Sequence, residues 1–81
     1  MERFTVTRTR RYGNEATQIS HIYSVNRNKT KRDDVVRIAN DMLSNERLMT
    51  NEVVEYEVLL AYDNGKTEFI HRVEKSGKRS I

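Results

Sequence analysis

The clearest pattern of apolar and polar positions lies between Val53 and Glu74, where two runs rich in β-branched and aromatic residues flank Asn64-Gly65. An Asn-Gly pair between two such runs is a strong short-range signal for a β-hairpin. A two-residue type I′ loop at this pair would place Asp63 opposite Lys66 and would set the register of the whole hairpin.

This register divides the hairpin into two faces, because successive side chains of a strand point to opposite sides. The face predicted to cover the core pairs Tyr62 with Thr67, Leu60 with Phe69, Val58 with His71 and Tyr56 with Val73. The other face pairs Ala61 with Glu68, Leu59 with Ile70 and Glu57 with Arg72. One register therefore gathers most large apolar groups on one side and sets opposite charges across the strands on the other.

A second hairpin is predicted from residues 2–25. Residues 2–12 alternate, with Phe4 and Val6 on one side and mainly threonines on the other, as is typical of a pleated strand. Residues 13–15 supply turn residues, and residues 16–25 form the return strand. The core-facing side of this return strand is predicted to carry Ile19, His21, Tyr23 and Val25.

A helix is predicted between the two hairpins. Thr30 is a suitable N-cap, and Asp33 follows it three residues later as in a capping box. Ser44-Asn45 is expected to end the helix. An apolar stripe at helical spacing indicates the face that packs on the sheet, formed by Val35, Val36, Ile38, Ala39, Met42 and Leu43.

The predicted fold class is α+β, with the order β-β-α-β-β. We expect a two-layer structure with a mainly antiparallel four-stranded sheet and one helix packed on one face. Residues 1–75 are expected to form a single domain, followed by a basic, flexible C-terminal tail at residues 76–81. The pattern leaves the order of the strands in the sheet open.

The composition places the chain among small cytoplasmic proteins. It has 81 residues and no cysteine, so no disulfide framework or cysteine-based zinc site can stabilise its small core. No apolar run approaches the roughly 20 residues of a membrane span, and no apolar stretch follows Met1 as in a signal peptide. We expect no membrane partner, no cofactor and no metal.

The charge is distributed unevenly. Residues 1–32 contain eight Lys or Arg and two acids, a net +6, and residues 33–74 contain four bases and ten acids, a net −6. Residues 75–81 add three bases. Basic ends around an acidic middle indicate a polyanionic partner. The other interpretation is that these charges support solubility and pair with one another inside the domain.

Two basic groups are the candidate nucleic-acid-binding residues. Arg8, Arg10, Arg11 and Tyr12 lie near the tip of the first hairpin, and Arg27, Lys29, Lys31 and Arg32 lead into the helix. Arginine forks and lysines suit phosphates, and no RNP-type motif, K-homology loop or zinc finger is present to read bases. We therefore expect backbone-dominated contacts with a steep dependence on salt, with RNA favoured over DNA.

A protein partner is the alternative hypothesis. Ile22, Leu59 and Ile70 are predicted to share the open face of the sheet, where an apolar patch can mark an interface. The protein would then be an inhibitor or adaptor that docks through this face, or one whose basic surface binds an acidic host protein. Homodimerisation through this face or through an edge strand is a secondary hypothesis.

An enzyme is the least favoured hypothesis. His21 and His71 are predicted to face the core, where they could approach one another across the sheet, but neither has a catalytic spacing to a serine, cysteine or carboxylate. The short chain, without proline or cysteine and rich in Asn, Thr, Arg and Lys, resembles the small accessory proteins that bacteriophages make against host functions. The sequence thus predicts a small non-enzymatic nucleic-acid-binding regulator or antagonist.

Overall fold

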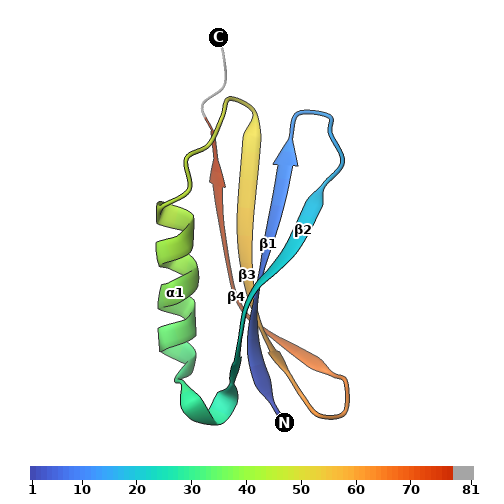
Figure 1. The fold of residues 1–81 in the computed structure, drawn as a ribbon, viewed down its shortest axis with the longest axis vertical. Helices are drawn as coiled ribbons and strands as arrows, with labels where there is room; N and C mark the ends of the chain where they lie inside the picture. Colours follow the sequence, from blue (N-terminus) through green and yellow to red (C-terminus); the bar gives the residue numbers. More distant parts are fainter. Residues whose placement is uncertain (78–81) are drawn as a thin grey trace.

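The computed structural model describes residues 1–77, and its elements follow the predicted order (Figure 1). They are β1 (Arg3–Tyr12), β2 (Gln18–Asn26), the 3-10 helix η1 (Arg27–Lys29), α1 (Arg32–Ser44), β3 (Glu52–Ala61) and β4 (Thr67–Ser76). All strand pairs are antiparallel, so the α+β class with four antiparallel strands and one α-helix is confirmed for these residues. The predicted tail, 76–81, lies outside the described residues from residue 78 onwards.

The sheet has the order β2-β1-β3-β4, so the two hairpins meet through their first strands. β1 and β3 pair along their full length, from Arg3 opposite Ala61 to Tyr12 opposite Glu52. In β3 the even-numbered residues from Glu52 to Leu60 are all buried, and the odd-numbered residues between them are only partly buried. A strand with a neighbour on each side can bury one face continuously, and β1 and β3 therefore form the centre of the fold.

The core consists of a few residues from three elements. Its buried hydrophobic residues are Phe4 and Val6 from β1, Val54, Tyr56, Val58 and Leu60 from β3, and Val35 and Ala39 from α1. Burying one such aliphatic or aromatic side chain stabilises a protein by about 1.5–3 kcal/mol. The edge strands β2 and β4 contain no fully buried residue. The two central strands and the predicted helical stripe therefore hold the fold together.

The turn between β3 and β4 is not the predicted type I′ turn. The Tyr62 N–H donates to the Lys66 carbonyl at 2.8 Å, and the Gly65 N–H donates to the Tyr62 carbonyl at 3.1 Å. Gly65 has a φ of +86°. Asn64 does not have a positive φ, because Asn51 is the single non-glycine residue with positive φ among residues 1–77. Since a type I′ turn needs positive φ at Asn64 as well, the loop is a type I turn closed by a glycine bulge.

The different loop shifts the register near the tip by one residue. The observed pairs there are Leu59 with Phe69, Leu60 with Glu68 and Ala61 with Thr67, so the predicted pairs of this part are wrong. A β-bulge between Val58 and Leu59 then takes up the extra residue. Beyond it the predicted pairs are confirmed: Val58 with His71, Glu57 with Arg72 and Tyr56 with Val73.

The bulge exchanges the positions of two apolar side chains of β4. Phe69 lies opposite Leu59, on the face away from the core, and is 60% exposed. Ile70 is partly buried and packs against the core cluster. The prediction that Phe69 covers the core and Ile70 faces outward is therefore wrong, because one inserted residue moves the following side chains to the other face.

A second β-bulge, between Val6 and Thr7, has the same effect on β2. Tyr23 lies opposite Val6 on the core side, but His21 lies opposite Thr7 and Ile19 opposite Thr9, on the other side. Ile19 is 66% exposed and His21 is also exposed. The prediction that these two residues share the core face with Tyr23 and Val25 is wrong for the same reason.

The helix begins one residue later than predicted. Lys31 occupies the N-cap position and makes no side-chain capping hydrogen bond, so Thr30 is not the cap. Thr30 instead ends η1, whose own N-terminus is capped by Asn26 through a 2.8 Å hydrogen bond from the Asn28 N–H. The intervening 3-10 turn displaces the start of α1 along the chain. Asp33 and Asp34 still lie in its first turn, where the helix dipole favours negative charge.

Candidate nucleic-acid interface

Arg8 is held by an internal ion pair on the core side of β1. Its Nε donates to Glu46 Oε1 at 2.7 Å and its Nη2 donates to Glu46 Oε2 at 3.2 Å. The Tyr56 hydroxyl donates to the same Oε1 at 2.8 Å. The side chains of Arg8 and Glu46 are 23% and 17% exposed. The hydrogen bonds from Arg8 lower the pKa of Glu46 against the opposing effect of burial, and they raise the pKa of Arg8.

Arg10 is neutralised in the same way, two residues further along β1. Its Nε donates to Oε2 of Glu52, a buried carboxylate whose other oxygen accepts the Met49 N–H at 2.9 Å. The hydrogen bond from the Met49 backbone, followed by the one from Arg10, lowers the pKa of Glu52. The Arg10 guanidinium also lies 5.4 Å from the centre of the Tyr12 ring, within cation–π range. Arg10 therefore covers one face of the aromatic ring that a base would use.

Sequence reasoning did not identify the acidic partners of these arginines. Glu46 and Glu52 lie at the two ends of the connection between α1 and β3. The sequence did indicate that such partners exist, because Arg8 and Arg10 occupy the side of β1 that carries the core residues Phe4 and Val6. A charge near a core requires a partner, and a connection that crosses this end of the sheet is the place to look for one.

Arg11 is the one arginine of the first hairpin's predicted group that is exposed. It lines a polar hollow of about 450 Å³ together with Gly13, Asn14, Asn51 and Ser76. Arg11 forms no ion pair within residues 1–77. Of the four residues predicted at this hairpin, Arg11 alone is therefore available to a partner as a full charge.

The segment of residues 26–32, here called the basic link, carries the other predicted group. Arg27, Lys29, Lys31 and Arg32 are all exposed. Arg27 Nη1 donates to Glu2 Oε1 at 2.6 Å, and this bond raises the pKa of Arg27. The other three cations form no ion pair with any described residue. The basic link therefore concentrates uncompensated positive charge in a short stretch of chain.

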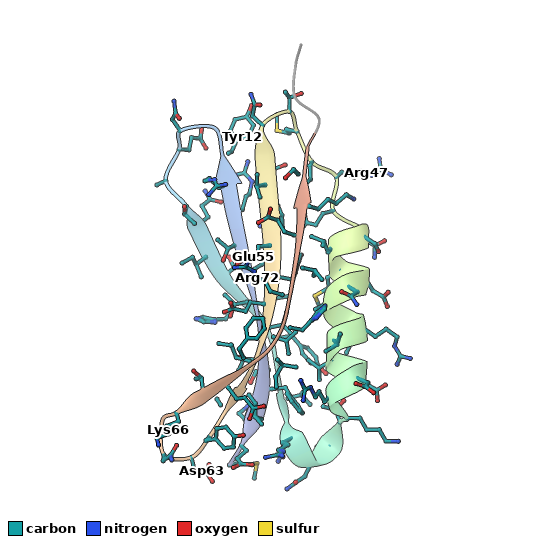
Figure 2. All side chains as sticks on the ribbon, turned by 180° about the vertical axis from the view of Figure 1, so that it is seen from behind. Tyr12, Arg47, Glu55, Asp63, Lys66 and Arg72 are labelled. Atoms are coloured by element: carbon teal, nitrogen blue, oxygen red, sulfur yellow. The ribbon has the colours of Figure 1, made fainter. Side chains whose placement is uncertain are left out.

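The two predicted groups do not form one surface. The turn between β1 and β2 lies at one end of the sheet and the basic link lies at the other, beside the start of α1 (Figure 1). The longest dimension of the molecule is 47 Å, and it runs along this direction. Seen from behind, Tyr12 lies near the end of the sheet opposite to the start of α1 (Figure 2). A single short ligand cannot contact both groups.

A hollow of about 340 Å³ adjoins the basic link. Its apolar lining comes from Phe4, Leu60 and Ile70, and its polar lining comes from Arg27, Thr30, Lys31, Arg32 and Glu68. Glu68 accepts a 2.6 Å hydrogen bond from the Tyr62 hydroxyl, which raises the pKa of Tyr62. The hollow therefore combines an apolar wall, several cations and one carboxylate. No feature of the sequence pattern indicated it, because its residues come from four separate segments of the chain.

The apolar residues predicted for a protein interface are not brought together. Leu59 lies on the open face beside Phe69, but Ile70 lines the hollow at the basic link. Ile22, at the bulge of β2, lines a separate hollow with Met42, Asn45, Glu46, Arg47 and Tyr56. On the same face as Leu59, Arg72 forms an ion pair with Glu55 at 3.4 Å, and Figure 2 shows these two side chains side by side. Glu55 is the diagonal neighbour of Arg72, whereas the residue directly opposite Arg72 is Glu57.

The histidines do not approach one another. His21 contacts Thr7 Oγ1 at 3.3 Å on the open face of β2, and His71 contacts Asn40 Oδ1 at 3.2 Å between β4 and α1. The two strands are opposite edges of the sheet. Within residues 1–77, no three His, Cys, Asp or Glu side chains are grouped as a metal site. The approach of the two imidazoles that the enzyme hypothesis would require is therefore not observed.

The comparisons with known proteins add no assignment. No family model, no curated protein and no solved structure matches this chain. Among the described residues, no helix has the length and apolar character needed to cross a bilayer.

Proposed function

We propose that this protein is a small, non-enzymatic nucleic-acid-binding regulator or antagonist that contacts the phosphate backbone through the basic link. RNA is favoured over DNA as its ligand, and contacts to phosphate dominate the affinity. The observation that carries the proposal is the cluster of Arg27, Lys29, Lys31 and Arg32, four exposed cations within six residues, of which only Arg27 forms an ion pair in residues 1–77.

The distribution of ion pairs supports this choice of site. Arg8 and Arg10 are engaged with Glu46 and Glu52, so a polyanion would have to displace a partner already in place. Lys29, Lys31 and Arg32 of the basic link form no ion pair in residues 1–77 and carry no such cost. Phosphate contacts of this kind release condensed counterions from the nucleic acid. Arg11 is a second, isolated contact at the far end of the molecule. The affinity is therefore expected to depend on the basic link first.

A protein-binding role is the second candidate, and one observation favours it. Phe69 is 60% exposed beside Leu59 on the face of the sheet away from the core cluster. We take the helix and the sheet to form two layers, which leaves this face open to a protein or to a second copy of the chain. The apolar area is small and is bordered by the charged pair Arg72–Glu55, so this role ranks second.

Three charge reversals of one residue type test the leading proposal. Arg32→Glu changes the basic link, Arg11→Glu changes the tip of the first hairpin, and Arg47→Glu changes an exposed site beyond the C-terminus of α1. All three alter the net charge by the same amount. We expect Arg32→Glu to weaken binding to a single-stranded RNA at low salt by about tenfold or more, Arg11→Glu to weaken it less, and Arg47→Glu to leave it nearly unchanged.

The measurement is a fluorescence-anisotropy titration repeated at several salt concentrations. Binding should weaken with salt, and the slope should fall for Arg32→Glu because one phosphate contact is lost. Equal effects of all three variants would show a response to net charge alone and would contradict the assignment of the site. A folded wild-type protein that binds neither RNA nor DNA at low salt would refute the proposed function.

A further inference from the structure

We infer that the hollow beside the basic link accommodates one unpaired base of a single-stranded nucleic acid, with the adjacent phosphates on the cations of the link. The inference rests on the proposed function and narrows it, because it makes single strands the preferred ligand over duplexes. Its basis is the joint presence of an apolar wall, a cationic rim and a carboxylate around one hollow of about 340 Å³.

The apolar wall suits the face of a base. Ile70 is partly exposed and forms the accessible part of this wall, while Phe4 and Leu60 are only 4% and 3% exposed beneath it. Proteins that take an unpaired base into a pocket pack its faces against aromatic or other apolar side chains, and every base offers such a face. The volume, about 340 Å³, is near the lower end of the range of ligand sites, about 300–1,000 Å³, so the hollow has room for a base.

The charges determine which part of a nucleotide lies inside. Glu68 contributes a carboxylate to the lining, and a phosphate placed next to it would be repelled. Lys31 and Arg32 are exposed and lie at the rim, where a phosphate can bind while remaining hydrated. With the base inside the hollow and the phosphates outside it, the phosphates contact Lys31 and Arg32 and stay away from the Glu68 carboxylate. The Glu68 carboxylate can also accept a hydrogen bond from an exocyclic amino group, which cytosine, adenine and guanine have and uracil lacks.

A duplex cannot use this hollow without losing base stacking. Its bases are stacked and paired, so only its phosphates can reach the protein, and double-stranded RNA is read mainly through shape and backbone. Single-stranded segments can turn a base outward at little cost. The structure therefore separates two modes of binding: contact of phosphates with the basic link, open to any nucleic acid, and insertion of a base, open to single strands.

The first test uses the unaltered protein with three ligands of equal length, about ten nucleotides, which is within the site size of small single-strand binders. These are an oligocytidine strand, the same sugar–phosphate strand without bases, and an RNA duplex. We expect the abasic strand and the duplex to bind about tenfold more weakly than oligocytidine. Equal binding of oligocytidine and the abasic strand would overturn the base site and leave the proposed function intact. Failure to bind any of them would refute the proposed function itself.

The second test locates the base. The chain has no tryptophan, so Ile70→Trp and Phe69→Trp each introduce a single tryptophan, whose emission can be excited apart from that of the tyrosines, on the two opposite faces of β4. We expect oligocytidine to quench the fluorescence of the Ile70→Trp protein and to leave that of the Phe69→Trp protein unchanged. Circular dichroism is the check that both variants are folded. Quenching at Phe69→Trp alone, or equal quenching of Ile70→Trp by an oligoglutamate peptide, would overturn the inference.

Discussion

Arg8 and Glu46, 38 residues apart in the chain, form a two-pronged ion pair that ties the connection between α1 and β3 to the core side of β1. The Tyr56 hydroxyl and the Lys75 ammonium donate further hydrogen bonds to Glu46, to its carboxylate at 2.8 Å and to its backbone carbonyl at 2.9 Å. Three strands and the connection are thus joined at one residue. Arg8, which the sequence analysis predicted to bind nucleic acid, therefore holds this connection against the sheet.

Replacing Arg8 tests this structural role. We expect Arg8→Leu to lower the free energy of unfolding by about 2 kcal/mol, because a partly buried carboxylate loses its charged hydrogen-bond donor. Arg11→Leu, on the same strand but exposed and without an ion pair in the described residues, should change it by less than about 0.5 kcal/mol. Urea denaturation measures both values. Equal effects of the two variants would show that the Arg8–Glu46 pair does not stabilise the fold.

The two paired glutamates predict loss of stability in acid. Glu46 and Glu52 both have a pKa below the ordinary value of 4.5 in the folded protein. A carboxylate with a depressed pKa stabilises the fold above its unfolded pKa, and this contribution disappears as the pH falls through the folded pKa. We therefore expect the free energy of unfolding to decrease below about pH 4.5.

Urea denaturation at a series of pH values measures this dependence. Arg8 and Tyr56, which donate hydrogen bonds to Glu46, both have a raised pKa and keep their protons throughout this range, so the carboxylates account for the change. Glu46→Gln and Glu52→Gln should each flatten the pH dependence, whereas Glu74→Gln, an exposed site on β4, should leave it as it is. An unaltered slope in Glu46→Gln would contradict the assignment.

Two substitutions test the turn between β3 and β4, and only the one at Asp63 distinguishes it from a type I′ turn, in which Gly65 would also have a positive φ. Gly65→Ala should lower the free energy of unfolding by about 1–2 kcal/mol, because Gly65 has a φ of +86°. Asp63→Pro should be tolerated with a loss below about 0.5 kcal/mol, since Asp63 is the second residue of a type I turn, where proline is favoured. In a type I′ turn the Asp63 N–H would bond across the hairpin, and a large loss on Asp63→Pro would therefore favour that turn.

The positions of Phe69 and Ile70 give the most direct test of the β-bulge. We expect Ile70→Ser to lower the free energy of unfolding by about 2 kcal/mol, because it removes a partly buried aliphatic group that packs on the core. Phe69→Ser, at an exposed position, should change it by less than about 0.5 kcal/mol. Thermal denaturation of the two variants measures the difference. A larger loss for Phe69→Ser than for Ile70→Ser would instead support the predicted two-residue loop.

Much of the fold follows from local patterns. Alternating residues predicted all four strands, and the stripe built on Val35 and Ala39 predicted the helical face that reaches the core. The Asn64-Gly65 pair placed the second hairpin correctly, although the turn type was wrong. Each of these signals acts over a few residues, since a strand or helix reveals its buried side through the spacing of its own side chains.

The candidate site depended less on local patterns. The sequence marked every basic residue, but it could not show that Arg8 and Arg10 are paired while Lys31 and Arg32 remain without an ion pair in residues 1–77. Nor could it show that the two basic groups lie at opposite ends of the molecule. Both facts depend on contacts between residues far apart in the chain.

The sequence by itself thus determined the number and order of the strands and of the single α-helix in residues 1–77 and the location of the positive charge, but not the 3-10 helix η1. Only the tertiary structure decided the order of the strands, the faces occupied by His21, Phe69 and Ile70, and the hollow beside the basic link. The reason is physical: element type depends on local periodicity, whereas bulges, ion pairs and hollows result from how distant segments pack. The second hairpin illustrates both, because its strands were predictable and its register near the tip was not.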